Sequence, residues 1–298
     1  MQSNRLDFIR RCSFIYLVVI LTVASDRAPA EAGSTESQSG FITAHDGVPI
    51  AYSAYGGGSP TLLFVHGWSC DRSYWEQQVA PFSRDFRVVT VDLPGHGESG
   101  MGRKEWLMAS FGADVSAVVM GLDLKNVILI GHSMGGAVIL EAARRLPGRV
   151  RGLVFVDTYG DLSTSMTTEE ITVFLIPFRA NFEQTTRAWV RTMFPEDADQ
   201  ALVEQVVEDM SAAVPEVALE VLQSSTIVMY GRDRTTLLQD LDVPLFGIHS
   251  DNPPPDAESM ERYGVDVVTV SGVGHFLMME GPARFNSALT NVIASMVD

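Results

Sequence analysis

The chain has 298 residues, of which 46% are apolar and 19% are charged, and its formal net charge at pH 7 is −16. This composition provides enough apolar side chains for a large globular core, which excludes a disordered or fibrous chain. The negative charge argues against binding to a nucleic-acid backbone, because no basic stripe is available to replace the counterions of the phosphates. We therefore expect no nucleic-acid partner.

The first 30 residues have the three-part layout of a secretory signal peptide. Three arginines precede the uncharged run of residues 12–24, and an Ala-x-Ala cleavage pattern follows at 28–30. The uncharged run has 13 residues, whereas a bilayer crossing needs roughly 20. We expect cleavage, export to the periplasm or the medium, and no stable membrane insertion afterwards. An uncleaved anchor is the alternative, because the cleavage pattern lies some way past the apolar run.

Cysteine and histidine usage gives no sign of a bound metal. Cleavage after Ala30 would remove Cys12 and leave Cys70 as the single cysteine of the chain. One cysteine cannot form an internal disulfide, and it has no partner cysteine for a metal site. No two histidines have the spacing of metal ligands, so we expect neither a metal nor a cofactor.

Continuous apolar runs dominate the chain after a lead-in of residues 31–40, which is expected to be flexible, and a hairpin predicted around the Asp46–Gly47 turn. Runs without alternation are typical of strands that are buried on both faces, as in a parallel sheet. Six such runs are predicted strands: residues 61–65, 86–91, 126–131, 151–157, 243–249 and 265–270.

Helical segments fall between these strands, which predicts an α/β fold: a three-layer α/β/α sandwich with a mostly parallel sheet. The interval from 158 to 242 is far longer than a crossover needs. We interpret residues 161–232 as an inserted helical cap, and residues 41–160 and 233–298 as the core. The predicted core helices are 71–80, 104–120, 135–146, 233–242, 256–263 and 282–296.

Two helix starts are predicted inside the cap. Asp197 and Gln200 form a capping-box pattern ahead of an apolar helix face, and Pro215 is expected in the first turn of the next helix. The apolar run of residues 171–178, together with Trp189, either lines a pocket above the sheet or packs the cap helices against one another.

A serine stands at the turn between a predicted strand and a helix of small residues. Gly131, Ser133 and Gly135 match the G-x-S-x-G pattern of a nucleophile elbow. The glycines fit because side chains at these positions would collide with the strand or helix beside them. Ligands of a parallel sheet bind beyond the carboxyl ends of its strands. We therefore predict that Ser133 is a nucleophile rather than only a small turn residue.

Four motifs, in this order and spacing, resemble those of the α/β-hydrolase superfamily over nearly the whole chain after the leader. Besides the elbow, "FVHGW" at 64–68 and "VDLPGHGES" at 91–99 are similar to its loops after strands three and four, and "GVGHF" at 272–276 is similar to the loop that carries its catalytic histidine. The resemblance implies the α/β-hydrolase fold. It also implies that the backbone N–H groups of Met134 and Trp68 form an oxyanion hole.

A serine hydroxyl needs a base within hydrogen-bond reach. His275 lies in a glycine-containing loop after the last predicted strand, and it follows the serine in the family order of serine, acid and histidine. We predict that His275 is this base. His66 and His96 are expected to be structural or to line the pocket, and His45 and His249 are expected to be packed. The side chain of His132, inside the elbow, is expected to point away from the Ser133 hydroxyl.

The acid that orients the imidazole is left open by the sequence. Many members of the superfamily carry a Gly-x-x-Asp turn after the seventh strand, and this chain has no glycine there. Asp251 is the nearest match and the preferred candidate. Asp157, at the end of a predicted strand, is the alternative, because some members supply the acid from that strand. Asp256 is a third candidate, although it also fits a helix N-cap.

A serine at the elbow favours acyl substrates. We predict a hydrolase that cleaves a carboxylic ester or a related acyl bond of a small to medium apolar substrate through an acyl-enzyme. Carbon–carbon bond hydrolysis or perhydrolysis would use the same residues, and the "GHSMGG" elbow also resembles the cofactor-free haloperoxidase branch. The alternative from another class is a catalytically silent binding protein with this fold.

Overall fold

The computed structural model describes residues 38–231 and 234–297, which belong to one compact unit of the chain, Gly33–Asp298. The predicted signal peptide and the lead-in up to residue 37 lie outside the described residues. Residues 38–40 are not a flexible segment, because they pair with residues 52–54 as the start of a strand.

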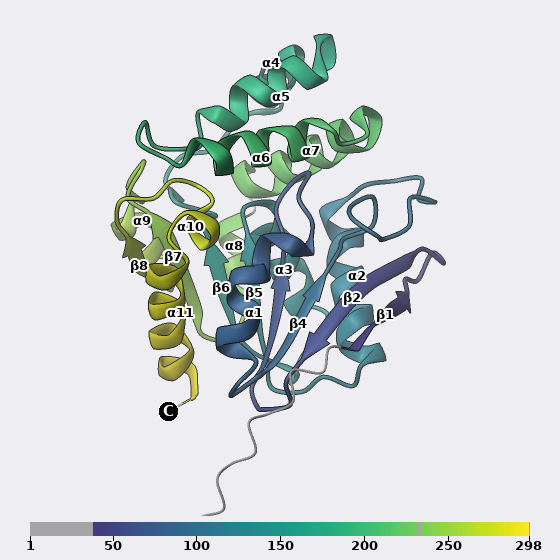
Figure 1. Cartoon of the computed structure of the whole chain (residues 1–298), viewed down its shortest axis with the longest axis vertical. Helices are drawn as coiled ribbons and strands as arrows, with labels where there is room; N and C mark the ends of the chain where they lie inside the picture. Colours follow the sequence, from purple (N-terminus) through teal and green to yellow (C-terminus); the bar gives the residue numbers. More distant parts are fainter. Residues whose placement is uncertain (1–37, 232–233, 298) are drawn as a thin grey trace, which may run out of the picture. The chain divides into compact units, whose positions relative to one another are not determined.

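One sheet of eight strands forms the centre of the unit (Figure 1). The strands are β1 (Gln38–Thr43), β2 (Pro49–Tyr55), β3 (Thr61–Val65), β4 (Arg87–Val91), β5 (Val127–His132), β6 (Val150–Val156), β7 (Leu245–Ser250) and β8 (Val265–Val270). Their order in the sheet is β1-β2-β4-β3-β5-β6-β7-β8. Strand β2 is antiparallel to both of its neighbours, and the other pairs are parallel. Every residue of β3 and β5 is buried, as their continuous apolar runs predicted.

Helices cover both faces of the sheet, which confirms the predicted three-layer sandwich. The helices of the core are η1 (Arg72–Trp75), α1 (Glu76–Phe82), α2 (Met108–Gly121), α3 (Met134–Ala143), α8 (Arg234–Gln239), α9 (Ala257–Glu261), α10 (Leu277–Glu280) and α11 (Pro282–Val297). Helices α1 and α11 contact each other on one face, and α2 and α3 contact each other on the other face (Figure 1). The sequence analysis did not predict α10, a single turn that directly follows the loop of His275.

Four further helices lie between β6 and α8, above the edge of the sheet at which the parallel strands end (Figure 1). They are α4 (Thr168–Ala180), α5 (Phe182–Arg191), α6 (Gln200–Ser211) and α7 (Pro215–Tyr230). Pro215 is the first residue of α7, as predicted. The predicted capping box is wrong: α6 begins at Gln200, so its N-cap is Asp199, whose carboxylate accepts a hydrogen bond from the N–H of Ala201 at 2.9 Å.

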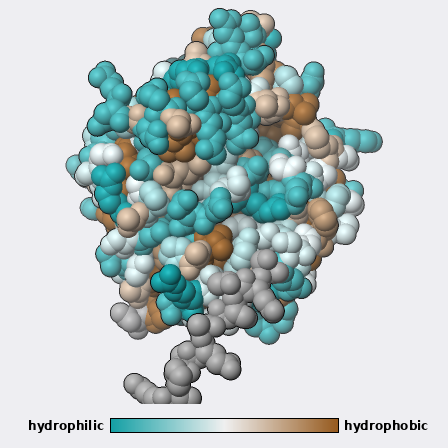
Figure 2. Space-filling model, viewed as in Figure 1, coloured by the Kyte–Doolittle hydropathy of each residue, from teal (hydrophilic) through white to brown (hydrophobic). Residues whose placement is uncertain are grey.

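The surface of this unit is mixed in character. Figure 2 shows one face that is mainly hydrophilic, with small apolar areas between the polar ones. Within the described ranges no single helix is both long and apolar enough to cross a membrane, and α6 and α7 together reach that length and composition with a bend of 102° between them.

Candidate active site

Ser133 occupies a strained turn between β5 and α3. Its φ of 51° and ψ of −119° lie in a region that side-chain-bearing residues rarely adopt. A Cβ atom on Gly135 would lie 2.5 Å from the carbonyl oxygen of Val65, and one on Gly131 would overlap the Gly135 carbonyl. Both glycines are therefore required for the close approach of the elbow to the sheet, as the sequence predicted.

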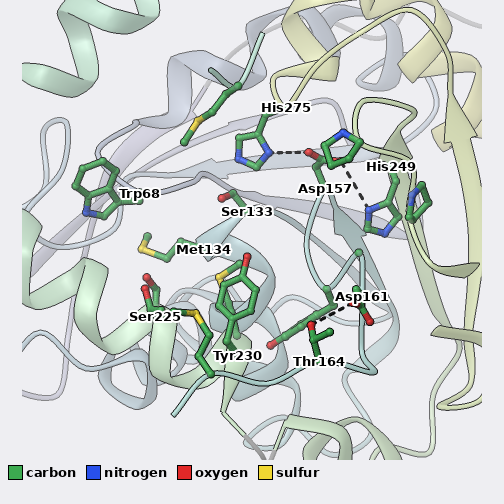
Figure 3. A pocket seen from close by; sticks show the side chains of 18 of the residues that line it. Trp68, Ser133, Met134, Asp157, Asp161, Thr164, Ser225, Tyr230, His249 and His275 are labelled. Atoms are coloured by element: carbon green, nitrogen blue, oxygen red, sulfur yellow. Dashed lines mark hydrogen bonds and ion pairs between the residues drawn. The ribbon is translucent and has the colours of Figure 1, made fainter. Parts of the chain in front are cut away.

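His275 follows β8 and lies beside the elbow. Its Nδ1 atom is 2.6 Å from Oδ2 of Asp157. Ser133, Asp157 and His275 line the same cavity, and Figure 3 shows the Ser133 hydroxyl on the side of the imidazole ring opposite to Asp157. The fold thus brings the predicted nucleophile and the predicted base together.

The carboxylate in contact with His275 is Asp157, and the preference for Asp251 is corrected. Oδ1 of Asp251 instead accepts a hydrogen bond from the N–H of Gly272 at 3.0 Å, and Asp256 caps α9. Asp157 follows β6 with a φ of 50°. The side chain of Asp157 reaches the imidazole of His275, whereas Asp251 binds the backbone at the start of the same loop.

Asp157 is held in its ionised form. Ser250 donates to its Oδ1 atom from the backbone N–H at 3.0 Å and from the hydroxyl at 3.2 Å. Burial raises the pKa of Asp157, but the contacts with His249 and His275 and the Ser250 amide outweigh burial and leave this pKa well below the ordinary value. A carboxylate that stays charged can orient an imidazole and stabilise its protonated form.

The two amides expected to form an oxyanion hole lie beside the elbow. Trp68 and Met134 both line the cavity with Ser133. A Cβ atom on Gly67 would lie 3.4 Å from Cβ of Ser133, so the Trp68 loop lies directly against the nucleophile. Across residues 38–231 and 234–297, neither the Trp68 nor the Met134 backbone N–H has an acceptor. Both amides are available to a bound group.

The side chain of Trp68 joins this loop to the cap. Its Nε1 atom donates a hydrogen bond to the carbonyl oxygen of Ala218 in α7 at 2.8 Å. Its ring contacts Phe178, Phe182 and Trp189, with ring centroids 5.7–6.1 Å apart. The cap therefore fixes the side chain of Trp68, the residue whose backbone N–H is one of the two free amides.

The cavity has a volume of about 740 Å³ and two chemically different sides. On its apolar side the cavity is lined by Phe174 and Trp189 of the cap, whereas Phe178 is buried among the cap helices. Some apolar residues of the cap thus line the pocket and others pack the cap helices against one another, so each of the two interpretations holds for part of the set. The polar side contains, among others, Asp161, Thr164, Tyr230, Asn252 and Asp256.

Residues 62–288 match the sequence model of the alpha/beta hydrolase family. The chain belongs to the α/β-hydrolase family. A non-heme haloperoxidase of Rhodococcus erythropolis is 37% identical over 118 residues, which are 39% of this chain and 43% of that protein. The dihydrolipoyllysine-residue acetyltransferase component of the acetoin cleaving system of Cupriavidus necator is 32% identical over 151 residues, which are 49% of this chain and 40% of that protein.

A solved structure of an esterase from Exiguobacterium antarcticum shares the fold of this α/β-hydrolase. It has a TM-score of 0.74 at 20% sequence identity and covers 86% of this chain and 100% of its own. At this identity the likeness concerns the fold alone. The matched part of the chain spans less than half the length of the two curated relatives.

His249 of this α/β-hydrolase is a site residue that the sequence analysis assigned to packing. It is only 2% exposed, lines the cavity, and places Nδ1 at 3.7 Å from Oδ1 of Asp157. The register of the sheet explains the contact, because Val156 of β6 pairs with Ile248 of β7, and the next residue of each strand is Asp157 and His249. The sequence does show that Asp157 and His249 stand at the ends of two predicted strands, but their contact can be inferred only if β6 and β7 are known to be neighbours.

Three further histidines of the hydrolase are buried, and burial lowers the pKa of each. The pKa falls to about 4 for His66 and to about 3 for His96 and His132. The rings of His66 and His96 lie 5.0 Å apart. Neutral, buried imidazoles suit the structural role expected of these residues.

One group in the described ranges has metal-ligand geometry. His45, Asp46 and Asp114 place their ligand atoms within 4.8 Å of one another. The guanidinium of Arg103 lies at the same place and is 2.7 Å from both carboxylates. This cluster is an ion-pair network in which Arg103 binds both carboxylates and compensates one of their two negative charges.

Proposed function

We propose that this α/β-hydrolase is a serine hydrolase that cleaves a carboxylic ester, or a related acyl bond, of a small to medium apolar substrate. The observation that carries the proposal is the hydrogen bond of 2.6 Å between His275 and Asp157 beside the strained Ser133. A serine, a histidine and an ionised aspartate arranged in this way form the general-base system of acyl transfer.

In the proposed reaction, Nε2 of His275 takes the proton of the Ser133 hydroxyl while Oγ attacks the acyl carbonyl carbon. The negative charge that develops on the carbonyl oxygen is received by the free backbone N–H groups of Met134 and Trp68. His275 then gives the proton to the leaving alcohol, and an acyl-enzyme remains. Water attacks the acyl-enzyme with His275 again as the base, which releases the acid and restores Ser133.

The cavity supports the choice of substrate. Its apolar side, which includes Trp68, Phe174 and Trp189, suits an apolar acyl group, and its volume of about 740 Å³ suits a ligand of small to medium size. The lining residues that carry a charge at neutral pH, apart from histidines, are aspartates. An anionic leaving group would be repelled there, so we expect neutral esters to be better substrates than anionic ones.

Replacement of the nucleophile tests the proposal. We expect Ser133→Ala to lower the hydrolysis of p-nitrophenyl acetate and p-nitrophenyl butyrate by about a thousandfold or more, since the covalent step is lost. Ser295→Ala, at an exposed position of α11, is the matched control and should keep wild-type activity. Retention of most activity in Ser133→Ala would remove Ser133 from the mechanism.

Labelling by a fluorophosphonate separates an enzyme from a silent binding protein. An activated serine reacts with this probe, whereas an unactivated hydroxyl does not. We expect stoichiometric labelling at Ser133, identified by mass spectrometry of the modified peptide. A wild-type protein that resists labelling, although it is folded, would favour the binding-protein alternative.

Perhydrolysis is a second candidate, favoured by the similarity to the Rhodococcus haloperoxidase. Hydrogen peroxide would replace water in the attack on the acyl-enzyme and release a peracid, which oxidises halide to hypohalite. The test is halogenation of a phenol indicator in acetate buffer with peroxide and bromide. Halogenation that persists in Ser133→Ala would exclude this route.

We also propose that the protein is exported after removal of residues 1–30. The arginines, the short apolar run and the Ala-x-Ala pattern support this. N-terminal sequencing of the protein from the periplasm or the medium should begin at Glu31. An intact N-terminus in the membrane fraction would instead indicate an uncleaved anchor.

A further inference from the structure

The peptide groups of His275 are bonded to two distant parts of the unit. Its N–H donates a hydrogen bond to the carbonyl oxygen of Met193, in the cap, at 2.9 Å. Its carbonyl oxygen lies 2.9 Å from Nε2 of His132, the residue before the nucleophile. The elbow and the cap therefore fix the backbone of His275 from opposite ends of the peptide.

A carboxylate that the proposed reaction does not use holds the residues on either side of His275. Glu280 accepts a hydrogen bond from the N–H of Gly274 at 2.9 Å through Oε2. It accepts a second one from the N–H of Phe276 at 3.0 Å through Oε1. Each oxygen thus binds one of the two amides that flank the imidazole-bearing residue.

The helix that carries Glu280 is itself firmly attached. Leu277 and Met278 of α10 are completely buried. The side chain of Gln78 in α1, also completely buried, donates hydrogen bonds to the carbonyl oxygen of Met278 at 3.1 Å and to Oδ1 of Asn286 at 3.0 Å. The Glu280 carboxylate therefore acts from a fixed support and is not a free surface group.

The aromatic residue after His275 adds apolar contacts to these bonds. Phe276 is completely buried, and its ring stacks on Phe194 of the cap with ring centroids 5.0 Å apart. A Cβ atom on Gly274 would overlap the carbonyl oxygen of Met193, so the loop passes close to the cap at this point. The contacts with Phe194 and Met193 thus restrict movement of the loop toward the cap, and the hydrogen bonds to Glu280 restrict its movement relative to α10.

We propose that Glu280 is a positioning residue for catalysis, which holds the imidazole of His275 between Asp157 and Ser133 through the two flanking amides. The inference rests on the proposed serine-hydrolase function. An ionised carboxylate is the group that can perform this task, because both oxygens must accept. A glutamine, although isosteric, would turn an NH₂ donor toward one of the two N–H donors.

Because Glu280 can be protonated, its role should be visible in how enzyme activity depends on pH. Burial raises the pKa of Glu280, and the bonds from Gly274 and Phe276 partly oppose that rise. The charged or titratable groups that face the carboxylate are His275, in the loop, and Asp157, at the end of β6. As the pH falls, protonation of Glu280 removes one acceptor and loosens the loop. The activity of the wild type is then lost through protonation of both His275 and Glu280, so it should fall more steeply with pH than the uptake of one proton would cause.

The test compares Glu280→Gln with Glu261→Gln, a control at an exposed carboxylate of α9. We expect Glu280→Gln to lower kcat by about 10- to 100-fold, because a misplaced base costs rate rather than affinity, with KM changed by less than about twofold. On the acid side of the pH profile, the activity of Glu280→Gln should fall with the slope of a single protonation, because only His275 then takes up a proton. Glu280→Asp, which keeps the charge, should recover part of the loss, and the control should match the wild type.

A measurement without substrate separates this inference from the proposed function. The proton between Nδ1 of His275 and Asp157 should give a low-field ¹H resonance in the wild type, which broadens or disappears in Glu280→Gln. If the wild type hydrolyses no ester but the resonance responds in this way, the proposed function fails and the role of Glu280 stands. A folded Glu280→Gln with wild-type kcat and an unchanged resonance overturns the inference.

Loss of folded protein in step with the loss of kcat would also overturn it, since the role of Glu280 would then be structural. If Glu280→Gln does not fold, Glu280→Ala provides the same readouts, because it removes both acceptors without turning a donor toward the amides. A folded Glu280→Ala with wild-type kcat would be equally contrary to the inference.

Discussion

The proposed nucleophile and the proposed base of this hydrolase are held in position by different means. Ser133 is positioned by the chain next to it, through a φ of 51° and two glycines that let the turn approach the sheet. His275 is positioned by two segments far away in the sequence, at the Met193 carbonyl and at His132, and also by Glu280, five residues further along the chain. The comparison teaches that a strained local turn can be recognised in a sequence, whereas a loop held from outside cannot.

Breaking the elbow should have the largest effect. A methyl group on Gly135 would lie 2.5 Å from a backbone oxygen of β3, which cannot move without shifting the sheet. We expect Gly135→Ala to lower the free energy of unfolding by about 2–3 kcal/mol and kcat/KM by more than about a hundredfold. Urea unfolding and ester hydrolysis measure the two effects.

The control for this variant is Gly57→Ala, where a Cβ atom would meet nothing within 4 Å. It should leave both quantities unchanged. A Gly135→Ala protein with wild-type stability and activity would show that the elbow tolerates a side chain and would weaken the contrast between the two regions.

The next largest effect is expected at the partner of the base. Asp157→Asn should lower kcat by about 10³- to 10⁴-fold, because the amide no longer stabilises the protonated imidazole. Asp251→Asn, at the carboxylate that binds only the Gly272 amide, should cost less than about fivefold. Equal losses in the two variants, or the larger loss in Asp251→Asn, would contradict the assignment of the acid.

The dependence of stability on pH provides a second test of the role of Asp157. The pKa of Asp157 in the folded protein lies below its ordinary value, which is about 3.9 in an unfolded chain. Its contribution to stability is therefore present above about pH 4 and is lost as the pH falls toward the folded-state pKa. The difference in urea midpoint between wild type and Asp157→Asn should narrow below that pH, and a pH-independent difference would oppose this prediction.

A smaller effect is expected where the cap meets the Trp68 loop. Trp68→Phe keeps an aromatic ring but removes the donor to the Ala218 carbonyl. We expect a loss of about 1 kcal/mol in unfolding free energy and a decrease in kcat of about three- to tenfold, since one oxyanion donor is less well fixed. An increase in KM alone would indicate that Trp68 only lines the cavity.

Much of the fold could be predicted because each strand carries its own signal. The run at 61–65 and the run at 265–270 coincide with β3 and β8, since continuous apolar segments bounded by turn residues leave little choice. The capping pattern at Asp197 failed because Asp199, two residues later, could cap the same helix, and a choice between neighbouring caps depends on where the helix packs.

The site was predictable to the extent that it is local. Gly131, Ser133 and Gly135 carry their geometry in five residues, but the choice between Asp157 and Asp251 depends on which strand end faces the His275 loop. His249 was missed for a similar reason, because its contact with Asp157 arises from the register between β6 and β7. Such information lies in the arrangement of strands and not in any one segment.

The hydrogen bond that the His275 N–H donates to Met193 and the one that the Trp68 indole donates to α7 hold the cap against the core. A cap that swung away from the sheet would break both bonds and would remove one support each from the His275 loop and the Trp68 loop. With the cap in place, the exposed lining residues of the cavity include Thr164, Tyr230 and residues 252–254. A cap exchanged between members of this family would need acceptor carbonyls at the same two places, or the chimera would hold these two loops less firmly and have a lower activity.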